Sequence, residues 1–242
     1  RRVTQGAGGR GAAGTVAHEP KDAMGRCEGC HDASQGHSWL PYQDRHFAAV
    51  SCESCHIPQV YAPSLQQVDW TVVTTDGAAA LTYRGIDGPL GESTSLISGY
   101  QPVLMQRENV DGETLLSPYN LVSAFYWVAG DPAKPVSRDI LEQVYLDGDQ
   151  YADEILALLD ADNDGELSAA ELRLDTDEKV VAVANRLEAA GFQNPKIVAE
   201  IQPYSLNHTV TNGDWANRDC QACHSDSSRL TAPIQVAAYL PG

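Results

Sequence analysis

The sequence predicts an α+β fold for this chain of 242 residues, and three observations carry the prediction. Short β-prone runs between residues 68 and 128 are punctuated by Asp-Gly pairs, which is a hairpin signal. From Ile140 to Ala190 the apolar residues instead recur with helical spacing. Between His18 and Tyr61 large aliphatic residues are scarce. We therefore expect an irregular protein with a β-hairpin-rich middle, an inserted helical segment and little conventional core near its beginning.

The individual elements follow from these patterns. The run Leu121–Ala129 is too short for a membrane span and predicts a buried strand. Apolar residues between Val180 and Leu187 face one way, and Gly191 is expected to end that helix. Strands are predicted at 70–75, 80–83 and 121–128, with Asp-Gly turns at 76–77, 87–88 and 111–112.

Composition excludes several classes of function. Hydrophobic residues at 43% fit a soluble globular protein, and no apolar run approaches the roughly 18 residues of a membrane span. The formal charge of −17 argues against a nucleic-acid partner, because phosphate binding needs a basic face. No basic, apolar leader begins the sequence, so we expect a cytoplasmic protein or a mature, processed one.

The cysteines favour a mature, processed protein. All six fall in three copies of C-x-x-C-H, at residues 27–31, 52–56 and 220–224, and none remains for a disulfide. This is the attachment signature of c-type haem, in which two thiols bond the porphyrin and the following histidine binds its iron. The residues in these roles are Cys27, Cys30, His31, Cys52, Cys55, His56, Cys220, Cys223 and His224.

Two alternatives use the same cysteines. The first two pairs would suffice for a four-thiolate zinc ribbon, but the third pair would then lack partners. Thioredoxin-like redox pairs are the other alternative, and neither one requires a histidine after every second cysteine. We therefore predict three covalently bound haems c. Because haem c is attached outside the cytoplasmic membrane in prokaryotes, we expect a periplasmic or extracellular protein whose signal peptide has been removed.

Four further histidines, His18, His37, His46 and His208, are enough to give every iron a second imidazole. Bis-histidine ligation fills both axial positions, which suits electron transfer and closes the iron to substrate. A histidine outside a motif is otherwise an ordinary surface or core residue, and Met24 and Met105 are weaker candidate ligands. The sequence does not assign a distal histidine to a particular iron.

Residues 160–171 match the EF-hand calcium loop at every specified position. The alternative is a solvated acidic turn. No second loop is found for a sensor pair, so a structural calcium ion is the preferred interpretation. Between residues 139 and 178 there are 14 acidic residues and one basic residue, which predicts a solvated face that can also attract a basic redox partner. The expected ligands are Asp160, Asp162, Asp164, Glu166, Ser168 and Glu171.

The expected organisation has five consecutive segments: a Gly-rich arm (1–16), a paired-haem module (17–66), a β-rich segment (67–130), a helical calcium segment (131–192) and a third-haem module (193–242). The first two motifs start 25 residues apart, so their haems are expected to pack close together. The third motif must lie close to the first two in the folded chain if electrons are to pass between the haems.

The chain resembles the octahaem tetrathionate reductase-like group of multihaem cytochromes. The resemblance rests on the calcium loop and on residues 37–42, 45–58, 68–72 and 204–208. It implies haem-binding roles for the matching cysteines and histidines. That group carries eight haems, one with a lysine-ligated catalytic iron, whereas this chain has three motifs, each ending in histidine, and four lysines.

Electron transfer is therefore the expected function, and we do not expect the protein to be an enzyme. The expected partners are redox proteins or extracellular electron acceptors, with no nucleic acid. The chain can act as a soluble carrier, as a subunit of a larger complex, or as a homopolymer forming an extracellular haem nanowire through its N-terminal arm; an arm that docks on its own subunit is the alternative. A small reductase of sulfur or nitrogen oxyanions, by analogy with the similar group, is the competing function.

Overall fold

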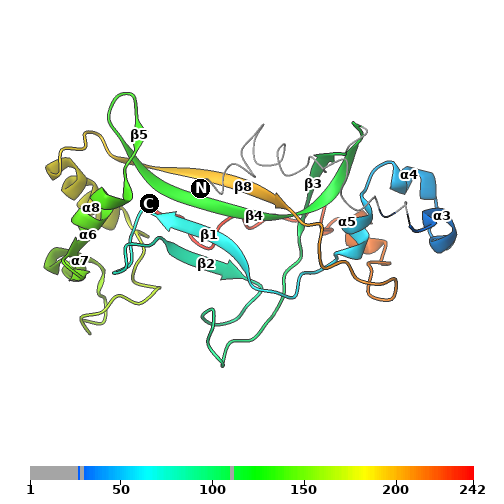
Figure 1. The fold of residues 1–242 in the computed structure, drawn as a ribbon, viewed down its shortest axis with the longest axis horizontal. Helices are drawn as coiled ribbons and strands as arrows, with labels where there is room; N and C mark the ends of the chain where they lie inside the picture. Colours follow the sequence, from blue (N-terminus) through cyan, green and yellow to red (C-terminus); the bar gives the residue numbers. More distant parts are fainter. Residues whose placement is uncertain (1–26, 28–29, 110–111) are drawn as a thin grey trace. The chain divides into compact units, whose positions relative to one another are not determined.

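The computed structural model describes residues 27, 30–109 and 112–242 (Figure 1). His18, Met24 and the arm at 1–16 lie outside the described residues. The chain divides into two compact units. Unit 1 comprises residues 1–64, 84–121 and 202–234, and unit 2 comprises 65–83, 122–201 and 235–242. Helices and a mixed sheet are both present, so the predicted α+β class is confirmed.

The elements of the described residues follow the chain in this order. The helices are α3 (Ala33–Gly36), α4 (Gln43–Phe47), α5 (Cys52–His56), α6 (Arg138–Tyr145), α7 (Asp153–Leu159), α8 (Asp177–Ala189) and α9 (Gln221–His224). The strands are β1 (Ser64–Trp70), β2 (Ala80–Arg84), β3 (Val103–Glu108), β4 (Thr114–Ala129), β5 (Lys134–Pro135), β6 (Leu146–Asp147), β7 (Gln150–Tyr151) and β8 (Lys196–Ser205).

Strand β4 is the longest of the sheet and contributes to both units. The strand order is β2-β1-β4-β3, and β5 and β8 also pair with β4. In unit 1, β3 runs antiparallel to β4, with Val103 opposite Tyr119. In unit 2, β1 runs parallel to β4, with Gln67 opposite Ser123. The buried strand predicted from the apolar run 121–129 is confirmed as the second half of β4.

The strand predicted at 70–75 is wrong, because β1 already ends at Trp70. The carbonyl of Thr71 accepts hydrogen bonds from Trp127 Nε1 at 2.9 Å and from the Tyr145 hydroxyl at 2.8 Å. These side-chain donors use the acceptor that a continued strand would offer to a neighbour. The Asp-Gly pair at 87–88 likewise yields a single bridge between Asp87 and Leu96 instead of a strand hairpin.

Unit 2 has a conventional apolar core. Figure 1 shows α6, α7 and α8 gathered beside the C-terminal end of β4, and both α6 and α7 contact α8. Full burial of each large apolar side chain stabilises the folded state by about 1.5–3 kcal/mol. Helix α8 is capped by Thr176 and is followed by Gly191 at φ +95°, so the predicted helix end is confirmed. The fully buried large residues of this core are Val72, Val73, Trp127, Leu141, Tyr145, Ile155, Leu159, Leu174 and Leu187.

The last eight residues, 235–242, lie across unit 2 as a strap. Gln67 Oε1 accepts a hydrogen bond from the Ala238 backbone N–H at 2.9 Å, and the Tyr239 hydroxyl donates to Asp69 Oδ2 at 2.6 Å. Asp69 is completely buried, and desolvation raises the pKa of its carboxyl group although hydrogen bonds from Thr71 and Tyr239 oppose the shift. The strap therefore satisfies a buried carboxylate that β1 cannot satisfy alone.

Unit 1 contains all three C-x-x-C-H motifs and a much smaller apolar core. Strand pairing and short helices hold it together, with long loops between them (Figure 1). Among the described residues, its buried apolar side chains are Ile57, Val60, Tyr119 and Leu121.

Candidate functional site

The second and third C-x-x-C-H motifs form short helical turns, and the first motif has a hydrogen bond of the same kind. The backbone N–H of His31 donates to the Cys27 carbonyl at 2.9 Å, and His224 donates to the Cys220 carbonyl at 2.9 Å. The second motif forms the helix α5. Residues three and four apart share a helix face, so this turn brings two thiols and one imidazole to the same side of the backbone.

The second motif is anchored to the beginning of β4. The backbone N–H of Ser51 donates to the Leu116 carbonyl at 2.9 Å, and Ser54 Oγ donates to the same oxygen at 2.6 Å. Within the motif, Glu53 pairs with Arg107 at 3.1 Å, and both side chains are largely buried. The sheet therefore fixes the orientation of α5.

The segment that leads into the third motif contacts the second motif. Thr211, nine residues before Cys220, donates its N–H to the His56 carbonyl at 2.8 Å. The N–H of Asn217 donates to the Cys55 carbonyl at 2.8 Å. Desolvation raises the pKa of the Cys55 thiol, and the neighbouring Cys223 raises it further, since the two sulfurs lie within electrostatic reach of each other.

The imidazole rings of His37 and His56 face each other. Their centroids are 5.9 Å apart, and the ring planes make an angle of 82°. The ring of Phe47 packs edge-on against His37 with centroids 5.7 Å apart, and Trp39 lies 6.4 Å away. His37, which directly follows α3, is thereby held close to His56, the histidine of the second motif.

A second pair has the same geometry. The ring of His46 on α4 faces that of His224, the proximal histidine of the third motif, with centroids 6.1 Å apart and planes at 85°. His46 and Phe47 are neighbours on α4, and Phe47 packs against His37. Helix α4 therefore links the two histidine pairs directly.

Three of these four rings have Nδ1 beside a backbone carbonyl. For His37 the acceptor is the Ala33 carbonyl at 2.7 Å, and for His46 it is the Tyr42 carbonyl at 3.2 Å. His56 Nδ1 lies 2.9 Å from the Thr211 carbonyl. A carbonyl can only accept a hydrogen bond, so Nδ1 carries the proton and the lone pair of Nε2 is available to a metal.

The donor set fits a bis-histidine haem. With Fe–N bonds of about 2.0 Å, two imidazoles on opposite sides of one iron have ring centroids roughly 6.3 Å apart. The centroid separations of 5.9 and 6.1 Å are close to that value. The cysteines of the same motifs are not joined by disulfides.

A zinc ribbon is not formed by the described residues. Within them, the one group of three or more potential ligands whose donor atoms lie within 4.8 Å of one another is Asp160, Asp162 and Asp164. All six cysteines are described, so the four-thiolate alternative has no cluster to support it.

The first motif has no such histidine pair among the described residues. His31 is exposed, as is His208, and no ring contact joins either to another histidine in that part of the chain. His208 is followed by Thr209 at φ +65°, a left-handed conformation that β-branched residues rarely adopt. The second ligand of the first haem thus remains a prediction, with His18 or His208 as the candidates.

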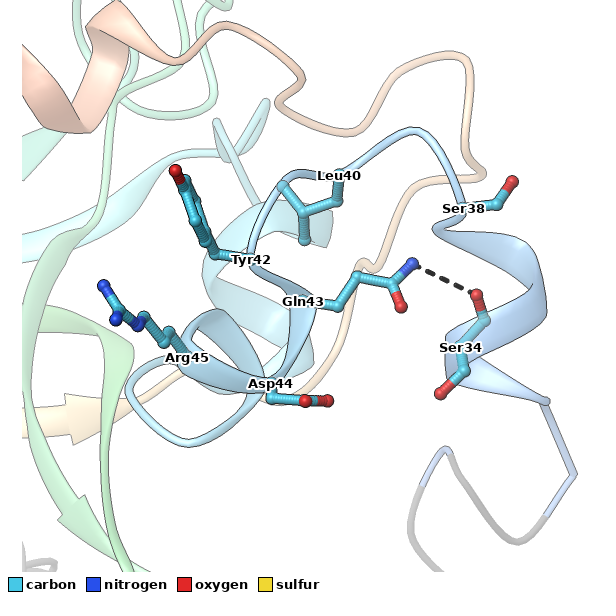
Figure 2. Close-up of a pocket in the computed structure, with 7 residues that line it drawn as sticks. All are labelled: Ser34, Ser38, Leu40, Tyr42, Gln43, Asp44 and Arg45. Atoms are coloured by element: carbon cyan, nitrogen blue, oxygen red, sulfur yellow. Dashed lines mark hydrogen bonds between the residues drawn. The ribbon is translucent and has the colours of Figure 1, made fainter.

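An open pocket of about 660 Å³ lies between α3 and α4 (Figure 2). The Gln43 side chain spans it and donates from Nε2 to the Ser34 carbonyl at 3.2 Å and to the His37 carbonyl. The guanidinium of Arg45 lies over the ring of Tyr42 at 5.4 Å. No cysteine is among the residues that line it, which are Ser34, Ser38, Leu40, Tyr42, Gln43, Asp44 and Arg45.

The predicted calcium loop lies in unit 2, after α7. Asp160 accepts hydrogen bonds from the N–H groups of Asn163 at 2.7 Å and Gly165 at 2.9 Å. Gly165 has φ +87°, as the sharp turn of such a loop requires. Glu171 reaches back across the loop to the N–H groups of Ala161 and Ser168, and hydrogen bonds, first those from Ser168, lower its pKa to about 2.

This arrangement fits a hard cation. The carboxylates of Asp160, Asp162 and Asp164 converge within 4.8 Å, and Glu171 is ionised and close to the start of the loop. A hydrogen bond from the Asp164 N–H lowers the pKa of Asp162, but desolvation and the repulsion from neighbouring carboxylates together raise it. Oxygen ligands in this number and spacing are those that Ca²⁺ prefers.

Two contributors to the site could not be predicted from the sequence. Thr211 holds His56 across 155 positions of sequence, and Arg229 contacts both the second and the third motif. Neither residue belongs to a recognisable motif, so no local signal could have identified them.

No protein-family model and no curated protein matches the chain. Among solved structures, the fold is similar to the crystal structure of octaheme cytochrome c from Shewanella oneidensis, with 15% sequence identity and a TM-score of 0.43. The similarity covers 84% of this chain and 49% of that one, so the chain spans about half the length of that protein. At this level the likeness carries no functional argument. Within the described residues, no helix is long and apolar enough to cross a bilayer.

Proposed function

We propose that this protein is a trihaem c-type cytochrome that transfers electrons outside the cytoplasm. The observation that carries the proposal is the two close pairs of histidine rings, His37 with His56 and His46 with His224, each of which includes the histidine of a C-x-x-C-H motif. A haem bound there supplies an iron that cycles between the ferrous and ferric states. The chain supplies both axial ligands, which leaves no position for a substrate.

The packing of unit 1 supports the same proposal. Its fully buried apolar residues among those described are few, whereas large aromatic side chains near the motifs are exposed. Tyr42 is 73% exposed, Tyr61 72% and Trp215 74%. Porphyrin rings would give such side chains an apolar surface to cover, so the haems would form much of the core of this unit.

The proposed ligand assignment follows from the geometry. His56 and His37 would bind the iron of the second haem, and His224 and His46 that of the third. Hydrogen bonds at Nδ1 orient three of these rings and raise their basicity, which stabilises the metal bond. The first haem would take His31, with His18 or His208 opposite.

The test is the haem content and spin state of protein produced in a host that attaches haem c. We expect a mass above the 26.1 kDa of the chain by three haems, and a low-spin spectrum that cyanide and nitrite do not change. An unmodified mass would contradict the proposal. A reductase of sulfur or nitrogen oxyanions would instead need one haem with an exchangeable sixth ligand, and a spectral change with nitrite would favour that alternative.

We also propose that the loop 160–171 binds one structural Ca²⁺. The support is the match of its hydrogen bonds to the EF-hand pattern and the convergence of three carboxylates. Bound calcium would reduce the repulsion among the acidic residues of this segment and fix the end of α7. Millimolar calcium outside the cell would be sufficient even for a weak site.

Assembly into an extracellular filament is a further part of the proposal. It rests on the Gly-rich arm predicted at 1–16. Electron microscopy and light scattering over a range of concentrations test it. Filaments with continuous close iron spacing would support a nanowire, whereas monomers at every concentration would leave a soluble carrier.

A further inference from the structure

Arg229 joins the second and third motifs. Its backbone N–H donates to the Ala222 carbonyl at 3.0 Å, and its Nη1 donates to the Ser54 carbonyl at 3.1 Å. Ser54 and Ala222 occupy the same place in the two motifs, immediately before the second cysteine. A third bond runs from Nη2 to the Pro102 carbonyl at 2.9 Å. One side chain and its own backbone therefore connect the two attachment turns.

No carboxylate of the described residues pairs with the guanidinium of Arg229. Its side-chain hydrogen bonds there go to backbone carbonyls, and the buried Nε has no hydrogen-bond partner among those residues. Desolvation lowers the pKa of the guanidinium, and Cys223 and Cys55 counteract the shift, yet arginine stays protonated in proteins. Arg107, which also contacts the second motif, differs because Glu53 neutralises it at 3.1 Å.

We propose that Arg229 sets the reduction potentials of the second and third haems and fixes their spacing, an inference that rests on the proposed haem attachment. A ferric bis-histidine haem carries one more positive charge than the ferrous form. A nearby uncompensated cation disfavours the ferric state, and burial strengthens the effect by weakening solvent screening. Both potentials are therefore raised.

The chain contains a matched control. Arg84 is also partly buried in unit 1, its Nη2 donates to the Leu121 carbonyl at 3.0 Å, and its Nε lacks a partner among the described residues. It lies over the ring of Tyr100 at 5.6 Å. Neither of these contacts involves a residue of a C-x-x-C-H motif. Loss of Arg84 should cost comparable stability without changing the charge at the haems.

The experiment compares the haem-loaded wild-type protein, Arg229→Gln, Arg229→Lys and Arg84→Gln by spectroelectrochemical titration. Arg229→Gln should lower the potentials of two of the three haems, each by at least a tenfold change in the reduction equilibrium, which is 59 mV for one electron. Arg229→Lys should largely restore them because it keeps the charge. Arg84→Gln should leave all three within a twofold change.

The spacing is measured on the same proteins by the magnetic interaction between the two ferric haems in EPR. It should be strong in wild type and weaker in Arg229→Lys, which loses the two-pronged donor. If Arg229→Gln fails to retain haem, Arg229→Met, which keeps an apolar stem, replaces it. Equal reduction potentials in Arg229→Gln and Arg84→Gln would overturn the inference. A fall in potential in Arg229→Lys as large as that in Arg229→Gln would overturn it as well. Wild type without covalent haem would instead refute the proposed function.

Discussion

His37 and His56 face each other across 5.9 Å, with ring planes nearly perpendicular at 82°. The two residues come from different elements, and each ring is fixed at Nδ1 by a carbonyl of the chain, Ala33 for one and Thr211 for the other. Hydrogen bonds of the polypeptide itself therefore fix the orientation of both rings. Preorganisation of this kind lowers the cost of binding.

Removal of His37 or of His46 should leave one haem iron without its sixth ligand. In His37→Gly the second haem would lose its sixth ligand, so about one third of the haem should become high-spin and bind cyanide. His46→Gly should do the same to a different haem, and the double variant should affect both. Added imidazole should restore the low-spin spectrum. A double variant that changes one haem, or none, would contradict the proposed pairing.

The ring angles predict a spectroscopic signature. Planes at 82° and 85° place the two imidazoles of each iron nearly perpendicular, which makes the low-spin ferric centre strongly anisotropic. Low-temperature EPR should therefore show two haems with a larger maximum g value than a haem whose imidazoles are parallel. His37→Gly and His46→Gly should each remove one of these signals. Signals typical of parallel planes for all three haems would be inconsistent with the structure.

Calcium should stabilise unit 2 in thermal unfolding. At a free concentration about 100-fold above Kd, a ligand that binds only the folded state adds roughly 2.7 kcal/mol. Glu171→Gln should lose most of this gain because it removes the carboxylate that closes the loop. Asp149→Asn removes a charge from the same acidic segment outside the loop and should keep the gain. An equal response to calcium in both variants would indicate nonspecific screening.

Asp69 should make stability depend on pH. Burial raises the pKa of its carboxyl group in the folded state, so the protonated form is favoured by folding. The resulting stabilisation is complete below the unfolded pKa, near 4, and is lost as the pH rises through the higher folded pKa. Asp69→Asn should therefore gain stability relative to wild type as the pH rises from about 4.

The measurement for Asp69 is denaturant unfolding at several pH values with constant calcium. The groups that act on the carboxyl group by hydrogen bonds or charge are Thr71, Tyr239, Arg173 and Tyr145. If the difference in free energy of unfolding between the two proteins does not vary with pH, the pKa of Asp69 is not raised. If Asp69→Asn instead loses stability relative to wild type as the pH rises, folding lowers the pKa of Asp69.

Sequence alone predicted the features that depend on local spacing. The turns of the second and third motifs, the end of α8 before Gly191 and the buried strand at 121–129 are all set by residues within a few positions of one another. Local patterns suffice there because hydrogen bonds of a turn and the period of an apolar face are local properties.

The pairing of elements distant in sequence was not predictable. The antiparallel pairing of β3 with β4 agrees with the hairpin expected at 111–112, but the Asp-Gly pattern does not predict that β1 pairs parallel with β4, where Gln67 lies opposite Ser123. The assignment of His37 to His56 depends on how α3, α4 and the segment at Thr211 meet in unit 1. Arg229 gave no signal, since a single arginine in a polar stretch is usually a surface residue.

The most direct test of the proposed haem ligation is an experimental structure of the haem-loaded protein with anomalous or map density sufficient to place the irons. We predict one iron between the Nε2 atoms of His37 and His56 and another between those of His46 and His224. Each porphyrin should be bonded to the two cysteines of its own motif, which are Cys52 and Cys55 for one and Cys220 and Cys223 for the other. An iron of the second or third motif with any other residue opposite its proximal histidine would contradict this ligation.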